Sequence, residues 1–346
     1  MKLSFGIPTR NRAHIIGSAL DSIISQATED VEIVIVDGAS TDYTREVVQR
    51  YSKTFPRIKY FRRDRCVGVD LDIAKAVELA SWGDYCWLMS DDDVLEDGAI
   101  AYVLEMLNRN PGLSGITVNY SNYDKTMKFP VHTFPSSSGG VLNSDRLFYD
   151  CNECFSLIGL QISFISTQIV KQKLWQQIAG EYDLKPYINE WLMSHIIGRM
   201  IQKEPKWLYI HRKCARQRIN NDSFVERVGI YNRQIIAHVA YSQTIAGLFG
   251  KNRSVYKNIF RALASDRLPR TFAVIKSRGI SFNLQFKLLI LYTKIYWRYV
   301  AYWTKVIPLF LVPDFIYKIV HRLYFKWMAQ KHLRSIKPNT MPQPCK

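Results

Sequence analysis

The sequence lacks several features that would place it in a common class of protein. Within residues 267–346, uncharged stretches such as Val306–Pro313 are far shorter than the roughly 20 residues that span a bilayer. No apolar segment of the signal-peptide kind follows Met1, so we expect no secretory leader. The six cysteines are scattered, which favours free thiols in a reducing cytosol over a disulfide framework. Neither GxGxxG after the first predicted strand nor GxxxxGK[ST] occurs, which disfavours a dinucleotide fold and a P-loop.

Acidic residues are scarce in the second half of the chain. Residues 1–150 carry 16 basic and 21 acidic side chains, whereas residues 151–346 carry 31 and 9. Residues 267–346 are the extreme, with 15 Lys and Arg and a single acid, Asp314. A basic half joined to a mildly acidic half indicates an anionic partner, which could be nucleic acid, an anionic membrane or an anionic substrate.

Residues 1–120 alternate between apolar, strand-like runs and amphipathic helices. Strands are predicted over 3–7, 31–36, 58–61, 84–89 and 115–120, and helices over 13–26, 41–52, 70–81 and 97–108. This alternation predicts parallel βαβ units and an α/β fold with a doubly wound, mostly parallel sheet. Residues 121–142 lack periodicity and are predicted to form a loop. Residues 143–265 are predicted to be largely helical, with a polar stretch over 211–223.

Carboxylates follow two of the predicted strands. Asp37 follows the second strand, and Asp91, Asp92 and Asp93 follow the fourth. Because ligands of open parallel sheets bind beyond the carboxyl ends of the strands, we expect these side chains at one edge. Adjacent carboxylates raise each other's pKa or recruit a cation, and oxygen ligands without His or Cys suit Mn²⁺ or Mg²⁺. A simpler alternative is that Asp92 or Asp93 caps the following helix.

Three segments resemble the signatures of family 2 glycosyltransferases, which have the GT-A fold. They cover about residues 1–120 in the expected order and read FGIPTRNRAHIIGSALDSI, VEIVIVDGASTDYT and GDYCWLMSDDDVL. The segment GVDLDIAKAVELASWGDYCWL most resembles the subgroup of abequosyltransferase and related O-antigen transferases. The resemblance implies inverting transfer of a hexosyl or deoxyhexosyl group from a nucleotide-sugar donor to an acceptor hydroxyl, with Mn²⁺ or Mg²⁺ as cofactor. The subgroup implies a lipid-linked oligosaccharide acceptor in surface polysaccharide synthesis.

The resemblance also implies roles for individual residues. The residues expected to bind the donor are Pro8, Thr9, Arg12, Asp37, Ser40, Asp70, Asp91, Asp92 and Arg216. Asp93 is the expected direct metal ligand, although Ser90 stands where many members have the first Asp of this motif. Arg216 lies between Arg212 and Arg218, and the planar guanidinium fork suits a diphosphate. A basic, solvated surface is the simpler alternative for these arginines.

A catalytic base is expected well downstream of the metal site, where family members often have Glu-Asp. This chain has Asn189-Glu190 in that segment, and we predict that Glu190 is the base. Glu181 and Asp183 lie close enough in sequence to compete with it, and a solvated helix position is the simpler alternative for Glu190. His195 could assist, although a lone histidine on a helix is more often structural.

We predict three parts: a nucleotide-sugar-binding half over 1–120, an acceptor-binding half over 121–265, and a basic, amphipathic, helical extension over 266–346. Within the extension, one helix is expected to end at Pro308 and Pro313. Its basic face would carry Lys287, Lys294, Arg298 and Lys305. Its apolar face would carry Leu288, Leu289, Leu291, Tyr292, Ile295, Tyr299 and Tyr302. A second helix would carry Lys318, Arg322 and Lys326.

A basic face opposite an aromatic, apolar face is typical of interfacial helices. We therefore expect a cytoplasmic protein that is held peripherally on the anionic inner face of the cell membrane without crossing it. The simpler alternative is that these helices pack on the catalytic domain and turn their basic residues to water.

Two other classes compete with a glycosyltransferase. Basic residues interleaved with aromatics also occur in nucleic-acid-binding proteins, but acidic loops at the sheet edge would repel a phosphate backbone, so we expect no nucleic-acid partner. A catalytically inactive scaffold of the same fold is favoured by the altered base motif and disfavoured by the intact aspartate triplet.

Overall fold

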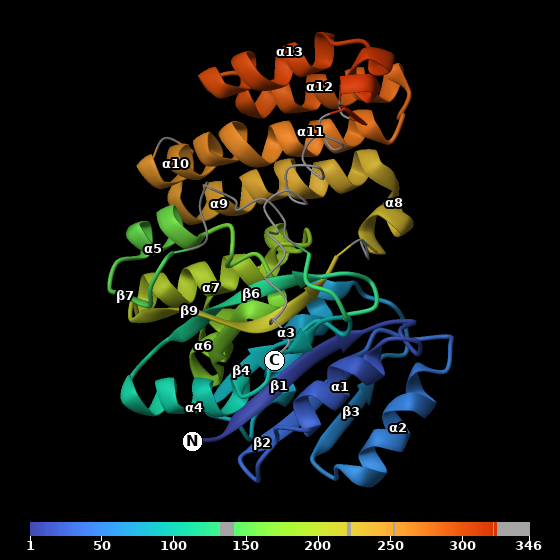
Figure 1. The fold of residues 1–346 in the computed structure, drawn as a ribbon. Helices are drawn as coiled ribbons and strands as arrows, with labels where there is room; N and C mark the ends of the chain where they lie inside the picture. Colours follow the sequence, from blue (N-terminus) through green and yellow to red (C-terminus); the bar gives the residue numbers. More distant parts are fainter. Residues whose placement is uncertain (132–141, 220–222, 252, 321, 324–346) are drawn as a thin grey trace, which may run out of the picture. The chain divides into compact units, whose positions relative to one another are not determined.

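Buried apolar strands form the centre of the fold. β1 (Leu3–Thr9) and β2 (Val31–Asp37) are buried at every position, as is typical of parallel strands covered on both faces. The computed structural model describes residues 1–131, 142–219, 223–251, 253–320 and 322–323. The chain forms two compact units, Met1–Ala262 and Leu263–Lys346, and Figure 1 labels most of their helices and strands.

The first unit contains one mixed sheet, to which the described residues contribute nine strands in the order β3-β2-β1-β4-β8-β6-β9-β5, with β7 paired to β9. The further strands are β3 (Ile58–Arg62), β4 (Tyr85–Leu88), β5 (Val94–Leu95), β6 (Gly115–Tyr123), β7 (Arg146–Phe148), β8 (Gln168–Lys171) and β9 (Trp207–Arg218). β1 to β4 are parallel to one another. β8 runs antiparallel between β4 and β6, so the sheet is mixed as well as doubly wound.

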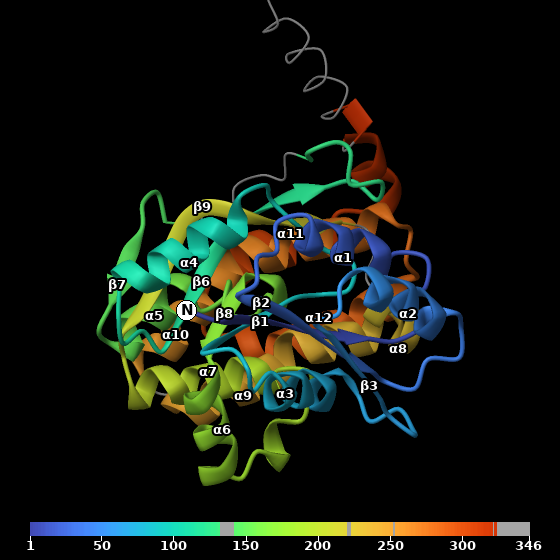
Figure 2. The ribbon, with the colours of Figure 1, turned by 90° about the horizontal axis from the view of Figure 1, so that it is seen from below.

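Helices cover both faces of this sheet. In Figure 2, α1 (Ile16–Ile24), α2 (Thr44–Thr54) and α4 (Ala99–Arg109) lie on one side. On the other side lie α3 (Val69–Leu79), α6 (Gln172–Glu181) and α7 (Leu192–Lys203). The unit is completed by α5 (Cys151–Ile158), α8 (Ser223–Gln234), α9 (Tyr241–Phe249) and α10 (Ser254–Ala262). This arrangement confirms the predicted α/β fold.

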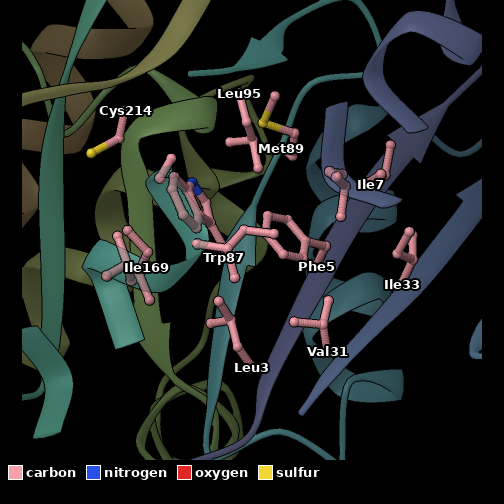
Figure 3. Packing of buried hydrophobic residues seen from close by; sticks show 14 of the residues in the cluster. Leu3, Phe5, Ile7, Val31, Ile33, Trp87, Met89, Leu95, Ile169 and Cys214 are labelled. Atoms are coloured by element: carbon pink, nitrogen blue, oxygen red, sulfur yellow. The ribbon is translucent and has the colours of Figure 1, made fainter. Parts of the chain in front are cut away.

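Aromatic and branched side chains fill the core between the sheet and its helices (Figure 3). The rings of Phe5 and Trp87 stack with their centroids 5.4 Å apart, and the Trp87 indole N–H donates to the Ser166 carbonyl at 3.0 Å. Burying a side chain of this size contributes roughly 1.5–3 kcal/mol relative to leaving it in water. The Trp87 bond matters for the site because it ties β4, which precedes the aspartate triplet, to the segment that contains Ser166.

Sequence patterns located the elements of residues 1–120 to within a few residues, except the short strand β5, which they missed. The prediction for residues 143–265 was only partly right. That region is not largely helical, because β7, β8 and β9 lie in it. Of the polar stretch predicted over 211–223, residues 211–218 form the second half of β9, which pairs with β5 and β6, and residues 220–222 lie outside the described residues. Part of the predicted loop, residues 132–141, lies outside the described residues.

The second unit consists of helices around an aromatic core. Its described elements are a π-helical turn at Leu263–Arg267 (η4), α11 (Leu268–Ser277), α12 (Phe282–Tyr296), a π-helical turn at Tyr302–Val306 (η5) and α13 (Ile307–Leu311). Its core includes Phe272, Leu288, Tyr292, Tyr296 and Tyr302. Among the described residues, no helix is both long and apolar enough to span a membrane.

The prediction of a single helix that runs through residue 305 is wrong. α12 ends at Tyr296, and Pro308 lies in the first turn of α13 instead of ending a longer helix. The apolar face predicted to meet a membrane is largely turned inward, because Leu288, Tyr292 and Tyr302 are fully buried. Of the predicted second basic stripe, Lys318 and Arg322 are exposed, and Lys326 lies outside the described residues.

Candidate active site

The carboxyl ends of β1 and β4 open into a pocket of about 630 Å³. Seven residues predicted for the site line it, namely Pro8, Thr9, Arg12, Asp70, Asp91, Asp92 and Glu190. The other four, Asp37, Ser40, Asp93 and Arg216, are not part of its wall. Sequence reasoning missed the contributions of Asp72, Met193 and Arg227, and no local motif marks these residues.

Asp37 organises the turn that follows β2. Its carboxylate is fully buried and accepts the backbone N–H of Ser40 at 2.7 Å and the hydroxyl of Tyr60. Burial first, and then the hydrogen bond to Asp37, raises the pKa of Tyr60. The hydroxyl of Ser40 accepts the backbone N–H of Asn11 at 2.9 Å, which links this turn to the segment after β1. Asp37 and Ser40 therefore support the pocket-lining segment after β1 without lining the pocket themselves.

The aspartate triplet holds more negative charge than its surroundings neutralise. Asp91 and Asp93 are both buried, and their pKa values are raised, first by burial and then by the charge of Asp92. The nearest cation to Asp91 is the guanidinium of Arg12, whose Nε lies 3.7 Å from the carboxylate. A bound cation would relieve this excess charge.

Asp93 is only 2% exposed and is braced by two protein donors. The Ser166 hydroxyl donates to one carboxylate oxygen at 2.5 Å, and the backbone N–H of Arg218 donates to the other at 3.0 Å. A carboxylate has about four lone-pair sites, so these two bonds leave capacity for a metal bond. Asp91 and Asp92 border the pocket, whereas Asp93 lies behind them.

These oxygen donors fit Mn²⁺ or Mg²⁺ in their chemistry. Within the described residues, however, no three acidic, His or Cys side chains converge as a ready-made metal site. Mg²⁺ in particular is usually held by one or two carboxylates together with substrate phosphates. The arrangement therefore suits a metal that arrives with, or is completed by, a phosphorylated ligand.

Glu190 lies immediately before the N-cap residue of α7 and has a left-handed backbone with a φ of 75°. One of its carboxylate oxygens accepts from Arg227 at 2.6 Å. The other, Oε2, is buried and has no hydrogen-bond partner among the described residues. Of the competing acids, Glu181 is exposed and pairs with Lys203, and Asp183 is exposed as well. The structure thus brings Glu190 to the pocket and leaves the other two acids away from it.

The arginines predicted to contact a diphosphate, Arg212, Arg216 and Arg218, do not line the pocket. Arg216 forms an ion pair with Glu96 at 2.7 Å and lies over the ring of Tyr123. Arg218 donates from Nε to the backbone carbonyl of Asp92 at 2.9 Å, so it supports the triplet from behind. The pocket wall draws its cations instead from Arg10, Arg12 and Arg227.

His195 is buried in α7 and is not part of the pocket wall. Its ring stacks on Tyr187 with centroids 3.5 Å apart. Burial, and then the charge of Arg199, lowers the pKa of His195 to about 4. The expectation that this histidine is structural fits these contacts.

Comparisons with known sequences agree on one family. The profile described as Glycosyl transferase family 2 matches residues 4–162. Abequosyltransferase RfbV of Salmonella typhimurium strain LT2 is 30% identical over 278 residues, which cover 77% of this chain and 81% of that protein. The GalNAc(5)-diNAcBac-PP-undecaprenol beta-1,3-glucosyltransferase of Campylobacter jejuni is 35% identical over 108 residues, which cover 31% of this chain and 35% of that protein.

Comparisons with solved structures show the fold. The mannosyltransferase PcManGT from Pyrobaculum calidifontis, solved in complex with GDP-Man and Mn²⁺, superposes with a TM-score of 0.52 at 17% identity, covering 92% of this chain and 87% of that chain. S. aureus TarS 1-349 in complex with UDP-GlcNAc gives a TM-score of 0.51 at 15% identity, covering 93% and 92%. The fold is the GT-A fold of glycosyltransferases. The family profile and the abequosyltransferase relative show that the chain belongs to glycosyl transferase family 2.

Proposed function

We propose that this chain moves a hexosyl or deoxyhexosyl group from a nucleotide-sugar donor to an acceptor hydroxyl with inversion at the sugar carbon, and that Glu190 is the base. One observation carries the proposal. The pocket at the sheet edge is lined both by aspartates of the triplet and by Glu190, which keeps a buried carboxylate oxygen without a partner among the described residues. An unpaired, buried oxygen is suited to accept a proton from an incoming hydroxyl.

In this reaction the acceptor oxygen bonds to the anomeric carbon, the bond from that carbon to the donor phosphate breaks, and the acceptor proton passes to Oε2 of Glu190. Arg12 and Arg227 line the same pocket and can bind the diphosphate of the donor. Mn²⁺ or Mg²⁺, held by Asp93 together with its neighbouring aspartates, would neutralise the charge that develops on the leaving diphosphate. The known binding of Mn²⁺ with GDP-Man by the mannosyltransferase of similar fold supports this cofactor.

Replacing Glu190 with Gln tests the base and excludes an inactive scaffold. Glu190→Gln should lower kcat by a factor of about 10²–10⁴ because it removes general-base catalysis. Binding of the nucleoside diphosphate with Mn²⁺, followed by thermal shift, should be retained. Asp183→Asn is the matched control, since Asp183 is an exposed acid of the same segment. Full turnover of Glu190→Gln, or loss of turnover in Asp183→Asn, would show that the wrong carboxylate has been chosen.

We further propose a lipid-linked glycan as acceptor, in the synthesis of an O-antigen-like surface polysaccharide. The relatives support this class, because one is named an abequosyltransferase and another is named for an undecaprenol-linked substrate. An assay that offers the donor to purified lipid-linked oligosaccharides and to the free oligosaccharides tests it. Transfer to both at equal kcat/KM would contradict a role for the lipid.

An acceptor in a membrane requires the enzyme to reach it, and we propose that the second unit rests on the anionic inner face of the cell membrane. The exposed surface around α12 and the break after it supports this. Six apolar side chains there are 45–75% exposed, namely Phe282, Phe286, Ile290, Trp297, Val300 and Trp303. At 100° per residue, Phe282, Phe286 and Ile290 span about 80° of one side of α12.

Basic side chains lie beside this apolar strip. Lys287 and Lys294 follow it around α12, and both are exposed, as are Arg298 and Lys305 beyond the helix. Each basic residue near an anionic leaflet contributes about 1 kcal/mol of attraction, and buried apolar side chains add to it. The surface that supports membrane binding is therefore this exposed strip, not the inward-facing Leu288 and Tyr292 that sequence periodicity selected.

Flotation with liposomes tests this proposal on the intact chain. Anionic liposomes should retain the protein at low salt, and neutral liposomes should not. The double change Ile290→Ser and Trp297→Ser should weaken flotation, whereas Tyr43→Ser, which alters an exposed aromatic of the first unit, should not. The proposal is wrong if anionic liposomes fail to retain the intact chain, or if both variants float alike.

A further inference from the structure

Asp70 is connected to the proposed base across a long stretch of sequence. It is the second residue of α3 and is almost fully buried. One of its carboxylate oxygens accepts the backbone N–H of Glu190 at 2.7 Å, and the other accepts that of Leu192 at 3.3 Å. Both oxygens are thus engaged by the backbone around Glu190, although the sequence placed Asp70 among the donor-binding residues.

The segment that Asp70 holds is strained and has no local cap. Glu190 has a φ of 75°, a conformation that is unfavourable for any residue with a Cβ. Trp191, the N-cap residue of α7, makes no side-chain capping bond. The first N–H groups of a helix need an acceptor, and a negative charge near them is favourable. Asp70 supplies that acceptor from another helix, so α3 determines where α7 begins.

We propose that Asp70 is a positioning residue, which holds the backbone of Glu190 in its left-handed conformation so that the Glu190 carboxylate lines the donor pocket. This inference rests on the proposed role of Glu190 as the base. Trp191 is fixed separately, since its indole N–H donates to the Ile236 carbonyl at 2.6 Å. Asp70 therefore controls a strained backbone position that carries the proposed base.

The electrostatics of Asp70 agree with this role. Burial raises the pKa of Asp70 to about 7, although the N–H of Glu190 opposes the rise, and the nearby Glu190 carboxylate raises it further. A neutral side chain could replace a buried carboxyl that accepts no hydrogen bonds at little cost. The Asp70 carboxyl accepts two backbone N–H groups, and its removal would leave both of them without an acceptor.

A double-mutant cycle between Asp70 and Glu190 tests the inference. Asp70→Ala should lower kcat about 10- to 100-fold, because a misplacement of about 1 Å can cost that much. The donor KM should stay within about twofold. In the Glu190→Gln background, Asp70→Ala should have almost no further effect, because a misplaced residue that is no longer a base has nothing more to lose.

Asp72 provides the matched control. It is a second buried acid of α3 that lines the same pocket, but its carboxylate accepts from Arg63 at 2.8 Å instead of from the backbone of the Glu190 segment. The effect of Asp72→Ala should therefore be the same in the wild-type and Glu190→Gln backgrounds. If Asp70→Ala does not fold, Asp70→Asn, which keeps one acceptor oxygen, replaces it in the same cycle.

The outcomes separate this inference from the proposed function. A raised donor KM with unchanged kcat in Asp70→Ala would make Asp70 a donor ligand and overturn the inference. Equal losses from Asp70→Ala in both backgrounds would overturn it as well, while Glu190→Gln stays impaired. If the proposed function is wrong, Glu190→Gln itself keeps full turnover, which removes the premise and the inference together.

Discussion

The aspartate triplet allows metal binding and structural support to be separated residue by residue. Asp93→Ala removes the acceptor of the Ser166 hydroxyl and of the Arg218 N–H. An unsatisfied buried donor costs about 1–3 kcal/mol, so the change should cost roughly 2–6 kcal/mol, less whatever is regained from the repulsion with Asp92. That is a large part of the roughly 5–15 kcal/mol that stabilises a folded domain. Asp92→Asn faces the pocket and should leave stability nearly unchanged.

Thermal unfolding with and without Mn²⁺ and a nucleoside diphosphate measures both effects. At a ligand concentration about 100 times Kd, binding stabilises by about 2.7 kcal/mol, and each kcal/mol shifts the Tm of a domain this size by roughly 2–4 °C. The wild-type Tm should therefore rise by roughly 5–10 °C. Asp92→Asn should have a normal Tm without ligand and a smaller rise. Asp93→Ala should have a lowered Tm and no Mn²⁺-dependent rise.

Two results would refute this reasoning. Full turnover in EDTA would remove the metal from the mechanism. A Mn²⁺-dependent rise in Asp93→Ala as large as in the wild type would show that Asp93 is not a ligand, whatever its effect on stability. Glu105→Gln, which alters an exposed acid of α4, is the control and should keep the full rise.

Two further outcomes test the packing around the site. His195 has its pKa lowered to about 4 from the ordinary 6.5, so the unfolded chain binds a proton that the folded chain excludes. The contribution of neutral His195 to stability is complete above pH 6.5 and is lost as pH falls toward 4. In urea unfolding, the wild type should therefore lose roughly 2 kcal/mol more of its free energy of unfolding than His195→Gln does when the pH is lowered to 5. A methyl group on Gly115 would lie 2.3 Å from Cζ3 of Trp207, so Gly115→Ala should lower the free energy of unfolding by roughly 1–3 kcal/mol or more. Gly180 has open space around it, so the control Gly180→Ala should be neutral or stabilising.

The first half of the fold could be predicted because its signals are local. β1 and β2 are mostly apolar runs of seven residues, and a run of that kind between polar turns has few alternatives to a buried parallel strand. The carboxylates of Asp37 and Asp91 then fall at one sheet edge by topology alone. Predicting that these carboxylates lie at the same sheet edge therefore required only the strand order of parallel βαβ units.

β9 could not be predicted in the same way. Its first four residues are buried, but the rest read HRKCARQR, which has the composition of a solvated surface. These residues form a strand because β5 and β6, distant in sequence, pair with them. Strand preference in such a segment depends on its neighbours more than on its residues.

The contacts of Glu190 were beyond sequence reasoning for a related reason. The family resemblance singled out the segment of Glu190, but the partners of Glu190 come from α3 and α8, and nothing in the local sequence of Asp70 or Arg227 indicates a contact with it. In the second unit, periodicity identified apolar residues of α12 but could not decide what covers them. Leu288 and Tyr292 pack inside that unit, while Phe282 and Trp297 are exposed.

The aspartates of the triplet and the basic residues of α12 should respond differently to salt. The carboxylates of Asp91 and Asp93 are buried, and buried charges are screened little. The basic side chains of α12 are exposed, and raising ionic strength from 0.1 to 1 M shortens their screening length from about 10 Å to about 3 Å. High salt should therefore abolish flotation with anionic liposomes while most of the Mn²⁺-dependent rise in Tm persists. A parallel loss of both across a salt titration would mean that one set of charges serves both functions.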